Sequence, residues 1–148
     1  MYKRILVPVD GSASANRGLQ EALRLARNQK ARLVLLHVVE EQFVTQAAEA
    51  MVFSEKLFEA MRASGRKVLA RAEALARKGG VKALAVLRES VTVPVADMVV
   101  REARRQRADL IVIGTHGRRG LTRAVMGSDA EDVVRSSPVP VLLVRARR

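Results

Sequence analysis

A glycine-rich segment in the last third of the chain carries the clearest chemistry. It runs from Gly114 to Ser128, directly after a short apolar run, and contains four glycines. Glycine allows positive φ angles and lets main-chain N–H groups approach a phosphate closely. Gly127 and Ser128 stand just before a predicted helix, whose free N–H groups and dipole favour an anion. Three arginines add positive charge to the same segment: Arg118, Arg119 and Arg123. The segment therefore predicts a cradle for a polyphosphate.

This cradle matches neither of the two commonest phosphate-binding motifs. The pattern Gly-x-x-x-x-Gly-Lys-Ser/Thr is absent, and so is Gly-x-Gly-x-x-Gly after the first predicted strand. The alternative is that the glycines only turn the chain and that Ser128 caps a helix. For any single glycine that structural role is the default interpretation. The combined spacing after a strand favours phosphate binding instead.

A second polar loop follows the first apolar run, with the sequence Asp10-Gly11-Ser12. An aspartate before a glycine often forms a turn, so a turn-forming role for Asp10 is the alternative to ligand binding. His37 falls inside a predicted strand, where a hydrogen-bonded core histidine is the expected role. With two histidines and no cysteine in the chain, no metal site of those residues is predicted. Any Mg²⁺ would arrive with the phosphates, held mostly by their oxygens and by water.

No pairing of a nucleophile with a base is evident. Ser12, Ser14 and Ser128 each precede or open a predicted helix, and none has a recognisable base partner. We therefore expect no catalytic residues and, at most, slow hydrolysis.

Five short apolar runs bounded by turn residues predict the strands that position these loops. Their nearly continuous β-branched and leucine content is typical of a parallel sheet covered on both faces. The runs are Ile5 to Val9, Leu33 to Val39, Val81 to Leu87, Leu110 to Ile113, and Val139 to Val144.

Four segments between the strands change to helical periodicity. The first follows Ser12 and Ser14 as capping candidates, and the last stops before Pro138. Their apolar positions recur at steps of three and four; the segments centre on Leu19 to Ala26, Phe58 to Leu75, Val95 to Ala103, and Ala130 to Val134.

Alternating strands and helices predict βαβ units with right-handed crossovers, and hence one doubly wound α/β domain over residues 1–148. Such folds bind ligands beyond the carboxyl ends of the strands, where the strand order reverses. Both polar loops lie at strand carboxyl ends, which is independent support for a ligand site there.

The net charge of +12 raises the alternative of a polyanion-binding protein. The basic residues are scattered through helical segments, however, and aromatic residues make up only 3% of the chain. Stacking platforms for single-stranded nucleic acid are therefore nearly absent, and we expect no nucleic-acid role. No apolar stretch approaches the roughly 18 residues of a membrane span, and no signal peptide is recognisable, so we expect a cytoplasmic protein.

All three phenylalanines fall in the segment after the second predicted strand, at Phe43, Phe53 and Phe58. Packing of this segment onto the protein's own sheet is the simpler interpretation. The alternative interpretation is an apolar surface that binds a protein partner and whose access is controlled by nucleotide.

Nearly the whole chain resembles the universal stress protein family. The spacing Gly-two-Gly-nine-Gly-Ser, met by Gly114, Gly117, Gly127 and Ser128, is similar to the nucleotide motif of the family's ATP-binding branch. The opening Ile5 to Ser12 and the closing Pro138 to Val144 also match. The resemblance implies a five-stranded parallel sheet of order 3-2-1-4-5, usually paired as a homodimer, that binds ATP, ADP or AMP.

The resemblance also implies roles for single residues. Pro8, Val9 and Asp10 would line the adenosine, with the Asp10 carboxylate near the ribose hydroxyls. The main chain of Val38 would bond the adenine edge. Gly114, Gly117, Gly127 and Ser128 would hold the phosphates, with looser neighbours at Thr115, His116, Arg118, Arg119 and Asp129.

Two further expectations follow from the family pattern. Thr92-Val93-Pro94 stands where the family often has Gly-x-Pro, so we expect Thr92 to cap the third helix and to narrow the adenine pocket. The strand Val139 to Val144 would lie at the sheet edge, where Pro140 is tolerated. Its apolar residues would pair with a second copy of the chain. The leading hypothesis is a nucleotide-binding regulatory protein, and a slow ATPase or phosphotransferase using the same pocket is the alternative.

Overall fold

A five-stranded parallel sheet forms the centre of the molecule in the computed structural model, which describes residues 1–40, 51–115 and 127–145. For residues 51–54 only the main chain is described. The strand order is β3-β2-β1-β4-β5, as predicted. The strands are β1 (Arg4–Pro8), β2 (Arg32–Glu40), β3 (Ala83–Ser90), β4 (Leu110–Gly114) and β5 (Val141–Val144).

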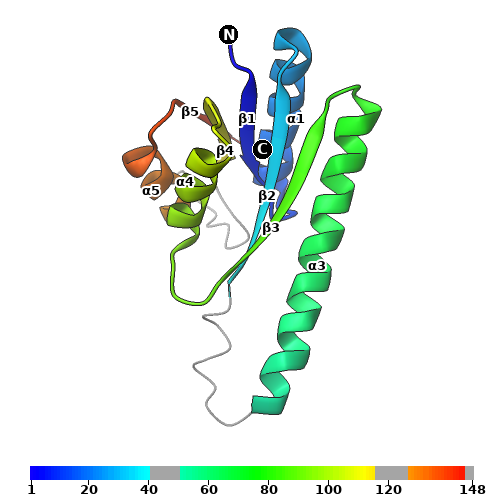
Figure 1. Ribbon diagram of the computed structural model, residues 1–148, viewed down its shortest axis with the longest axis vertical. Coiled ribbons are helices and arrows are strands. Elements are labelled where there is room, and N and C mark those ends of the chain that lie inside the picture. The colour runs from blue at the N-terminus through cyan, green and yellow to red at the C-terminus, as the bar shows by residue number, and fades with distance from the viewer. Residues whose placement is uncertain (41–50, 116–126, 146–148) are drawn as a thin grey trace.

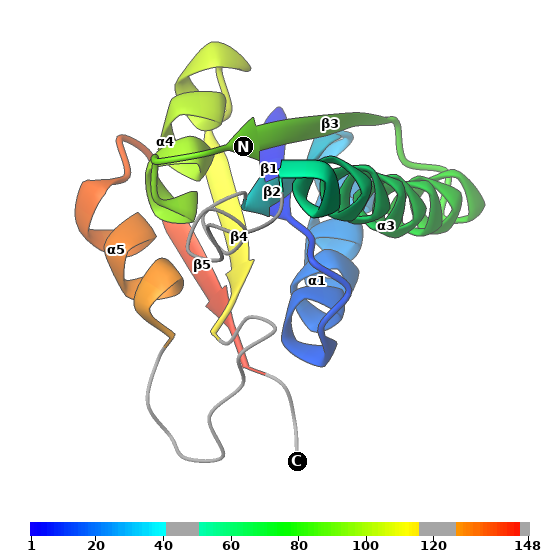
Figure 2. The same ribbon diagram turned by 90° about the horizontal axis from the view of Figure 1, so that it is seen from below.

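Four helices cover the two faces of the sheet, also as predicted. Figure 2 shows α1 and α3 on one side of the strands and α4 and α5 on the other. The helices are α1 (Ala13–Gln29), α3 (Met51–Lys78), α4 (Val95–Arg105) and α5 (Ser128–Ser136). None of the helices in the described residues is both long enough and apolar enough to cross a membrane.

The two faces of the sheet bury separate apolar clusters, because successive strand residues point to opposite faces. Ile5 and Val7 of β1 join Leu19 of α1 in the cluster on the α1 and α3 side. Leu6 of β1 packs with Val99 of α4 and Val133 of α5 on the other side. This burial on both faces accounts for the continuous apolar runs in the strands.

The expected boundaries differ from the observed ones mainly at β3 and β5. β3 begins at Ala83 and continues to Ser90, beyond the apolar run, because all eight of its residues from Ala83 onward pair with β2. β5 begins at Val141, just after Pro140. The expectation that Thr92 caps the third helix was wrong. Pro94 is the N-cap of α4 and makes no side-chain capping bond, and the turn before it is closed by the Ser90 hydroxyl, which accepts from Val93 N–H at 3.1 Å.

Candidate functional site

The strands that lead into the two polar loops of the sequence are neighbours in the fold. β1 and β4 are neighbouring strands, with Ile5 opposite Leu110 and Leu6 opposite Ile111. β1 also pairs with β2 on its other side (Figure 1). The chain leaves β1 for β2 in one direction and reaches β4 in the other, so this is the point where strand order reverses. The loops after β1 and β4 therefore flank the position where doubly wound folds bind ligands.

A tight turn holds Asp10 at the end of β1. Its Oδ1 accepts a hydrogen bond from Ser12 N–H at 2.8 Å, and Gly11 between them has a φ of 81°, which favours glycine. Ser12 Oγ then accepts from Ala15 N–H at 3.1 Å and caps α1. The turn-forming role considered for Asp10 is thus confirmed, and the cap predicted at Ser12 is confirmed too. The turn fixes the carboxylate at the carboxyl end of β1, where the strand order reverses.

The main chain of Val38 faces the same region. Leu33 N–H donates to Lys82 on the β3 side, whereas Leu36 C=O accepts from Val9 N–H on the β1 side. Main-chain groups alternate in direction along a strand, so those of Val38 point toward β1, as those of Leu36 do. The β1–β2 ladder ends at Pro8 opposite Leu36. The polar groups of Val38 therefore point past the last paired residue of β1.

Two buried residues, Val9 and His37, hold the end of β1 in place. The Val9 side chain belongs to the buried core, so only its main chain can face a ligand. His37 is also buried, and its Nδ1 lies 2.7 Å from Val9 C=O. The expected core histidine is confirmed. A Cβ at Gly65 of α3 would lie 2.5 Å from His37 Cδ2, so the glycine leaves room for the imidazole.

The glycine-rich segment is anchored at both ends by main-chain hydrogen bonds. Thr115 N–H donates to Val144 C=O of β5 at 3.0 Å, and Gly127 N–H donates to Thr115 C=O at 2.7 Å. Gly127 is the N-cap of α5, and Ser128 is its first residue. The structure thus brings together Gly114, Thr115, Gly127 and Ser128. The remaining predicted members, His116, Gly117, Arg118 and Arg119, lie outside the described residues.

Gly114 has a packing role that the sequence analysis missed. A Cβ at this position would lie 2.6 Å from the main-chain carbonyl of Ser14 in the first turn of α1. A Cβ at Gly18, one turn later, would lie 3.3 Å from Gly114 N. The small residues at 14 and 18 therefore let α1 approach the end of β4 closely. Their spacing of four on one helix face was the available signal.

The start of α5 combines an anion-attracting helix end with two carboxylates. Asp129 and Glu131 lie in its first turn, where they complement the helix dipole. Gly127 N–H already donates to Thr115 C=O, so a phosphate at this helix end would meet the N–H groups that begin with Ser128, close to the two carboxylates, of which Glu131 is paired with Arg135 at 2.8 Å. Within residues 1–40, 51–115 and 127–145, no group of three or more histidine or acidic residues is placed to hold a metal ion.

Comparisons with known proteins agree with this architecture. The sequence matches the profile of the Universal stress protein family over residues 1–145. It is 34% identical over 146 residues to a universal stress protein of Methanocaldococcus jannaschii, covering 98% of this chain and 83% of that protein. A crystal structure of a universal stress protein family member from Burkholderia pseudomallei is 37% identical, with a TM-score of 0.78 over 96% of this chain and 95% of that one.

Two similar structures contain an adenine nucleotide. One is the universal stress protein of Archaeoglobus fulgidus in complex with dAMP, at 27% identity and a TM-score of 0.68 over 97% of this chain and 98% of that one. The other is a universal stress protein in complex with cAMP, at 25% identity and a TM-score of 0.66 over 99% and 98%. The chain therefore belongs to the universal stress protein family.

Proposed function

We propose that this protein binds an adenine nucleotide (ATP, ADP or AMP) at the carboxyl ends of β1 and β4 and acts as a regulatory protein rather than as an enzyme. The observation that carries the proposal is the placement of two independent polar loops beside each other at the strand-order reversal. The complexes of related proteins with dAMP and cAMP support the ligand class. The proposal places the protein in the cytoplasm, where it meets these nucleotides.

Each part of the site has a distinct task in this proposal. The main chain of Val38, directed past the end of β1, bonds the adenine edge, beside Pro8 and Val9. The Asp10 carboxylate bonds the ribose hydroxyls. Gly127 leaves room for the phosphates at the start of α5, and the helix offers them its N–H groups from Ser128 onward. The loop residues His116, Arg118 and Arg119, or a Mg²⁺ bound with the phosphates, complete the phosphate site in this proposal.

Asp10→Asn separates the two roles of this side chain. Asparagine keeps an Oδ1 that can accept from Ser12 N–H, so the turn remains. It removes the charged acceptor for the ribose, and a hydrogen bond to a charged group contributes about 1.5–3 kcal/mol. We expect nucleotide affinity to fall by about tenfold or more in calorimetry, with an unchanged melting temperature. Asp10→Ala is the comparison variant, and it should lower stability as well.

Gly117→Val tests the phosphate part of the site. A β-branched residue there would block the close approach of the main chain to a phosphate. We expect weaker binding of ATP with less effect on adenosine. Unchanged affinity in both Asp10→Asn and Gly117→Val, with the variants folded, would remove the proposal. A steady-state ATP turnover above about one per second, within the range of ordinary enzymes, would favour the enzyme alternative.

A further inference from the structure

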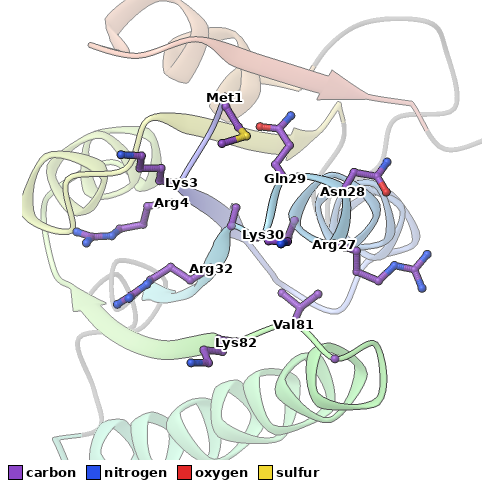
Figure 3. Close-up of a pocket in the computed structure, with 13 residues that line it drawn as sticks. Met1, Lys3, Arg4, Arg27, Asn28, Gln29, Lys30, Arg32, Val81 and Lys82 are labelled. Atoms are coloured by element: carbon purple, nitrogen blue, oxygen red, sulfur yellow. The ribbon is translucent and has the colours of Figure 1, made fainter.

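A basic hollow lies at the opposite end of the sheet from the nucleotide loops. It has a volume of about 940 Å³ and is formed by the amino ends of β1, β2 and β3 together with the last turn of α1. Six of its residues are cationic, and no acidic residue lines it. Figure 3 shows Lys3, Arg4 and Arg32 on the same side of the opening, with Lys82 next to them, while Arg27 points to the other side. The sixth cation is Lys30.

Three of these cations form a row across neighbouring strands. Arg4 of β1 is the direct partner of Arg32 of β2. The register of Leu33 with Ala83, and the bond from Leu33 N–H to Lys82 C=O at 2.9 Å, place Lys82 opposite Arg32. Residues in direct register share one face of the sheet at a strand spacing of about 4.8 Å. Like charges in this arrangement destabilise a sheet, so the row is costly unless an anion binds it.

The protein does not neutralise this row itself. Within the described part of the chain, none of the six cations forms a salt bridge. Lys3, Arg32 and Lys82 are exposed. The Arg4 guanidinium donates to Gln106 C=O at the end of α4, which uses one of its five N–H groups and holds it in place. Asp109 is close in space, but its oxygens accept from the main-chain N–H groups of Lys3 and Arg4 at 2.8 and 3.0 Å.

Neutralisation of helix dipoles is the competing explanation for these cations. The four described helices α1, α3, α4 and α5 all end at this side of the sheet, and cations near helix C-termini are stabilising. Each helix end carries only about half an elementary charge, however. Even four such ends and the single charge of Asp109 are fewer than six full positive charges. A substantial positive excess remains among the residues that line the hollow; Arg4, Arg32 and Lys82 carry it on the α4 side of the sheet, and Arg27 points to the other side.

We propose that this hollow binds a linear oligophosphate, meaning three or more linked phosphates, through their charge alone. A concave volume of this size is within the usual range of small-molecule sites. No aromatic residue lines it, so a nucleobase would find no stacking partner, and this disfavours single-stranded nucleic acid. The row of cations instead suits a ligand with regularly repeated charge.

This second site is separate from the proposed nucleotide site. β1 connects the two ends and spans five residues, which corresponds to about 16 Å at about 3.3 Å per residue. The nucleotide loops follow the carboxyl ends of the strands, and the cations precede or begin the strands. Loss of one site should therefore leave the other intact.

Inorganic tripolyphosphate is the ligand used in the test. All variants also carry Gly117→Val, so that the glycine-rich segment does not contribute to its binding. The test variant adds Arg32→Gln and Lys82→Gln. The matched control adds Lys67→Gln and Arg71→Gln, which remove two exposed cations of α3 that do not line the hollow. We expect tripolyphosphate to bind at low ionic strength and to weaken as salt screens the charges. Affinity should fall at least tenfold in the test variant and less than twofold in the control.

Three outcomes would overturn the proposal: no binding of tripolyphosphate, equal loss in the test and control variants, or tighter binding of oligouridylate than of tripolyphosphate with both lost together. The last outcome would identify the hollow as a nucleic-acid surface. Titration of AMP into the Arg32→Gln, Lys82→Gln variant of the otherwise native chain is the independent readout. Unchanged AMP affinity, together with lost tripolyphosphate binding, would establish two sites, and failure of AMP binding in the native chain would bear only on the nucleotide proposal.

Discussion

The two proposed anion sites, at opposite ends of the sheet, differ in the physical means by which they would bind an anion. At the carboxyl end, the described residues of the two loops are mostly small, among them Gly11, Ser12, Gly114 and Gly127, and α1 and α5 begin next to these loops. At the amino end, the four described helices terminate and long cationic side chains line a hollow. The helix dipole favours an anion at the first end and opposes one at the second. Binding at the first end therefore depends on close main-chain geometry, and binding at the second on side-chain charge.

The same contrast appears along one face of β3. Lys82 and Arg88 differ by six positions, so their side chains point to the same face. Arg88 is paired with Glu102 of α4, with Nε–Oε2 and Nη2–Oε1 distances of 2.8 and 3.1 Å. Lys82 at the amino end has no such partner among the described residues. The fold thus neutralises the cation that a helix covers and leaves the one at the hollow exposed.

Gly114→Ala should have the largest effect on stability. The added Cβ would lie 2.6 Å from the Ser14 carbonyl, and main-chain atoms cannot move aside cheaply. We expect a loss of about 3 kcal/mol in the free energy of unfolding, at the upper end for overpacked sites. Urea denaturation measures it.

Gly80→Ala is the control at the amino end. Gly80 has a φ of 69° and no atom within 4 Å of its Cβ position, so only the left-handed backbone opposes the change. The expected cost is about 1 kcal/mol. Equal costs at the two glycines would contradict the idea that only the carboxyl end depends on close packing.

Glu102→Gln should have the next largest effect. The Glu102 side chain is 4% exposed, and it accepts from Gln106 at 2.6 Å as well as from Arg88. The variant leaves Arg88 without its counter-charge. Breaking a buried pair costs about 3–5 kcal/mol, but Arg88 is 29% exposed, so we expect about 2 kcal/mol. Glu21→Gln, which removes a partly exposed carboxylate paired with Arg24, should cost less than about 1 kcal/mol.

The same pair predicts how stability depends on pH. Burial raises the pKa of Glu102, but the hydrogen bonds from Arg88 and Gln106 and the charges of Arg88 and Arg105 lower it more, so its pKa is below the usual 4.5. A lowered folded-state pKa means that the stabilisation is complete above 4.5 and is lost as pH falls through the folded-state pKa. Melting temperatures of wild type and Glu102→Gln should therefore converge below pH 4.5. A constant difference down to pH 3 would contradict this.

The strands and the position of both loops were predictable because they depend on local patterns, whereas the strand order followed from the resemblance to the family. Continuous apolar runs predict buried parallel strands, and alternation with helices predicts their connections. The end of β3 was not predictable in this way. Arg88, Glu89 and Ser90 are polar, and they continue the strand because β2 offers paired main-chain groups as far as Glu40. The end of β3 is set by its pairing with β2, and the sequence of β3 alone does not show how far this pairing extends.

The candidate site was predictable to a similar depth. Asp10 and the glycines followed from strand ends and turn chemistry, whereas their packing partners did not. The contact of Gly114 with Ser14 joins residues that are 100 positions apart. The fit of His37 under Gly65 joins a strand to the sheet-facing side of α3. Such contacts depend on how close two elements approach, which the sequence expresses only as small residues at suitable spacing.

Leu143→Lys should change assembly with the smallest effect on the fold. In the described sheet β5 has β4 as its only neighbour, and Leu143 is 36% exposed, whereas Leu142 packs against the core on the α1 side. Edge strands of this kind pair readily. We expect a homodimer through the strand Val139 to Val144 in light scattering at micromolar concentration, and a monomer of nearly unchanged melting temperature for Leu143→Lys. Leu142→Lys should instead destabilise the fold.

The opposite edge strand provides the matched control, because Leu84 of β3 is 50% exposed. Leu84→Lys makes the same change at the other edge and should leave the dimer intact. Two β5 strands related by a two-fold axis across the strands run antiparallel, which would set the nucleotide end of one protomer beside the cationic end of its partner. Each end of the joined sheet would then carry one proposed nucleotide site and one proposed cationic hollow. A monomeric wild type would refute this arrangement, and a dimer lost in Leu84→Lys but kept in Leu143→Lys would move the interface to β3.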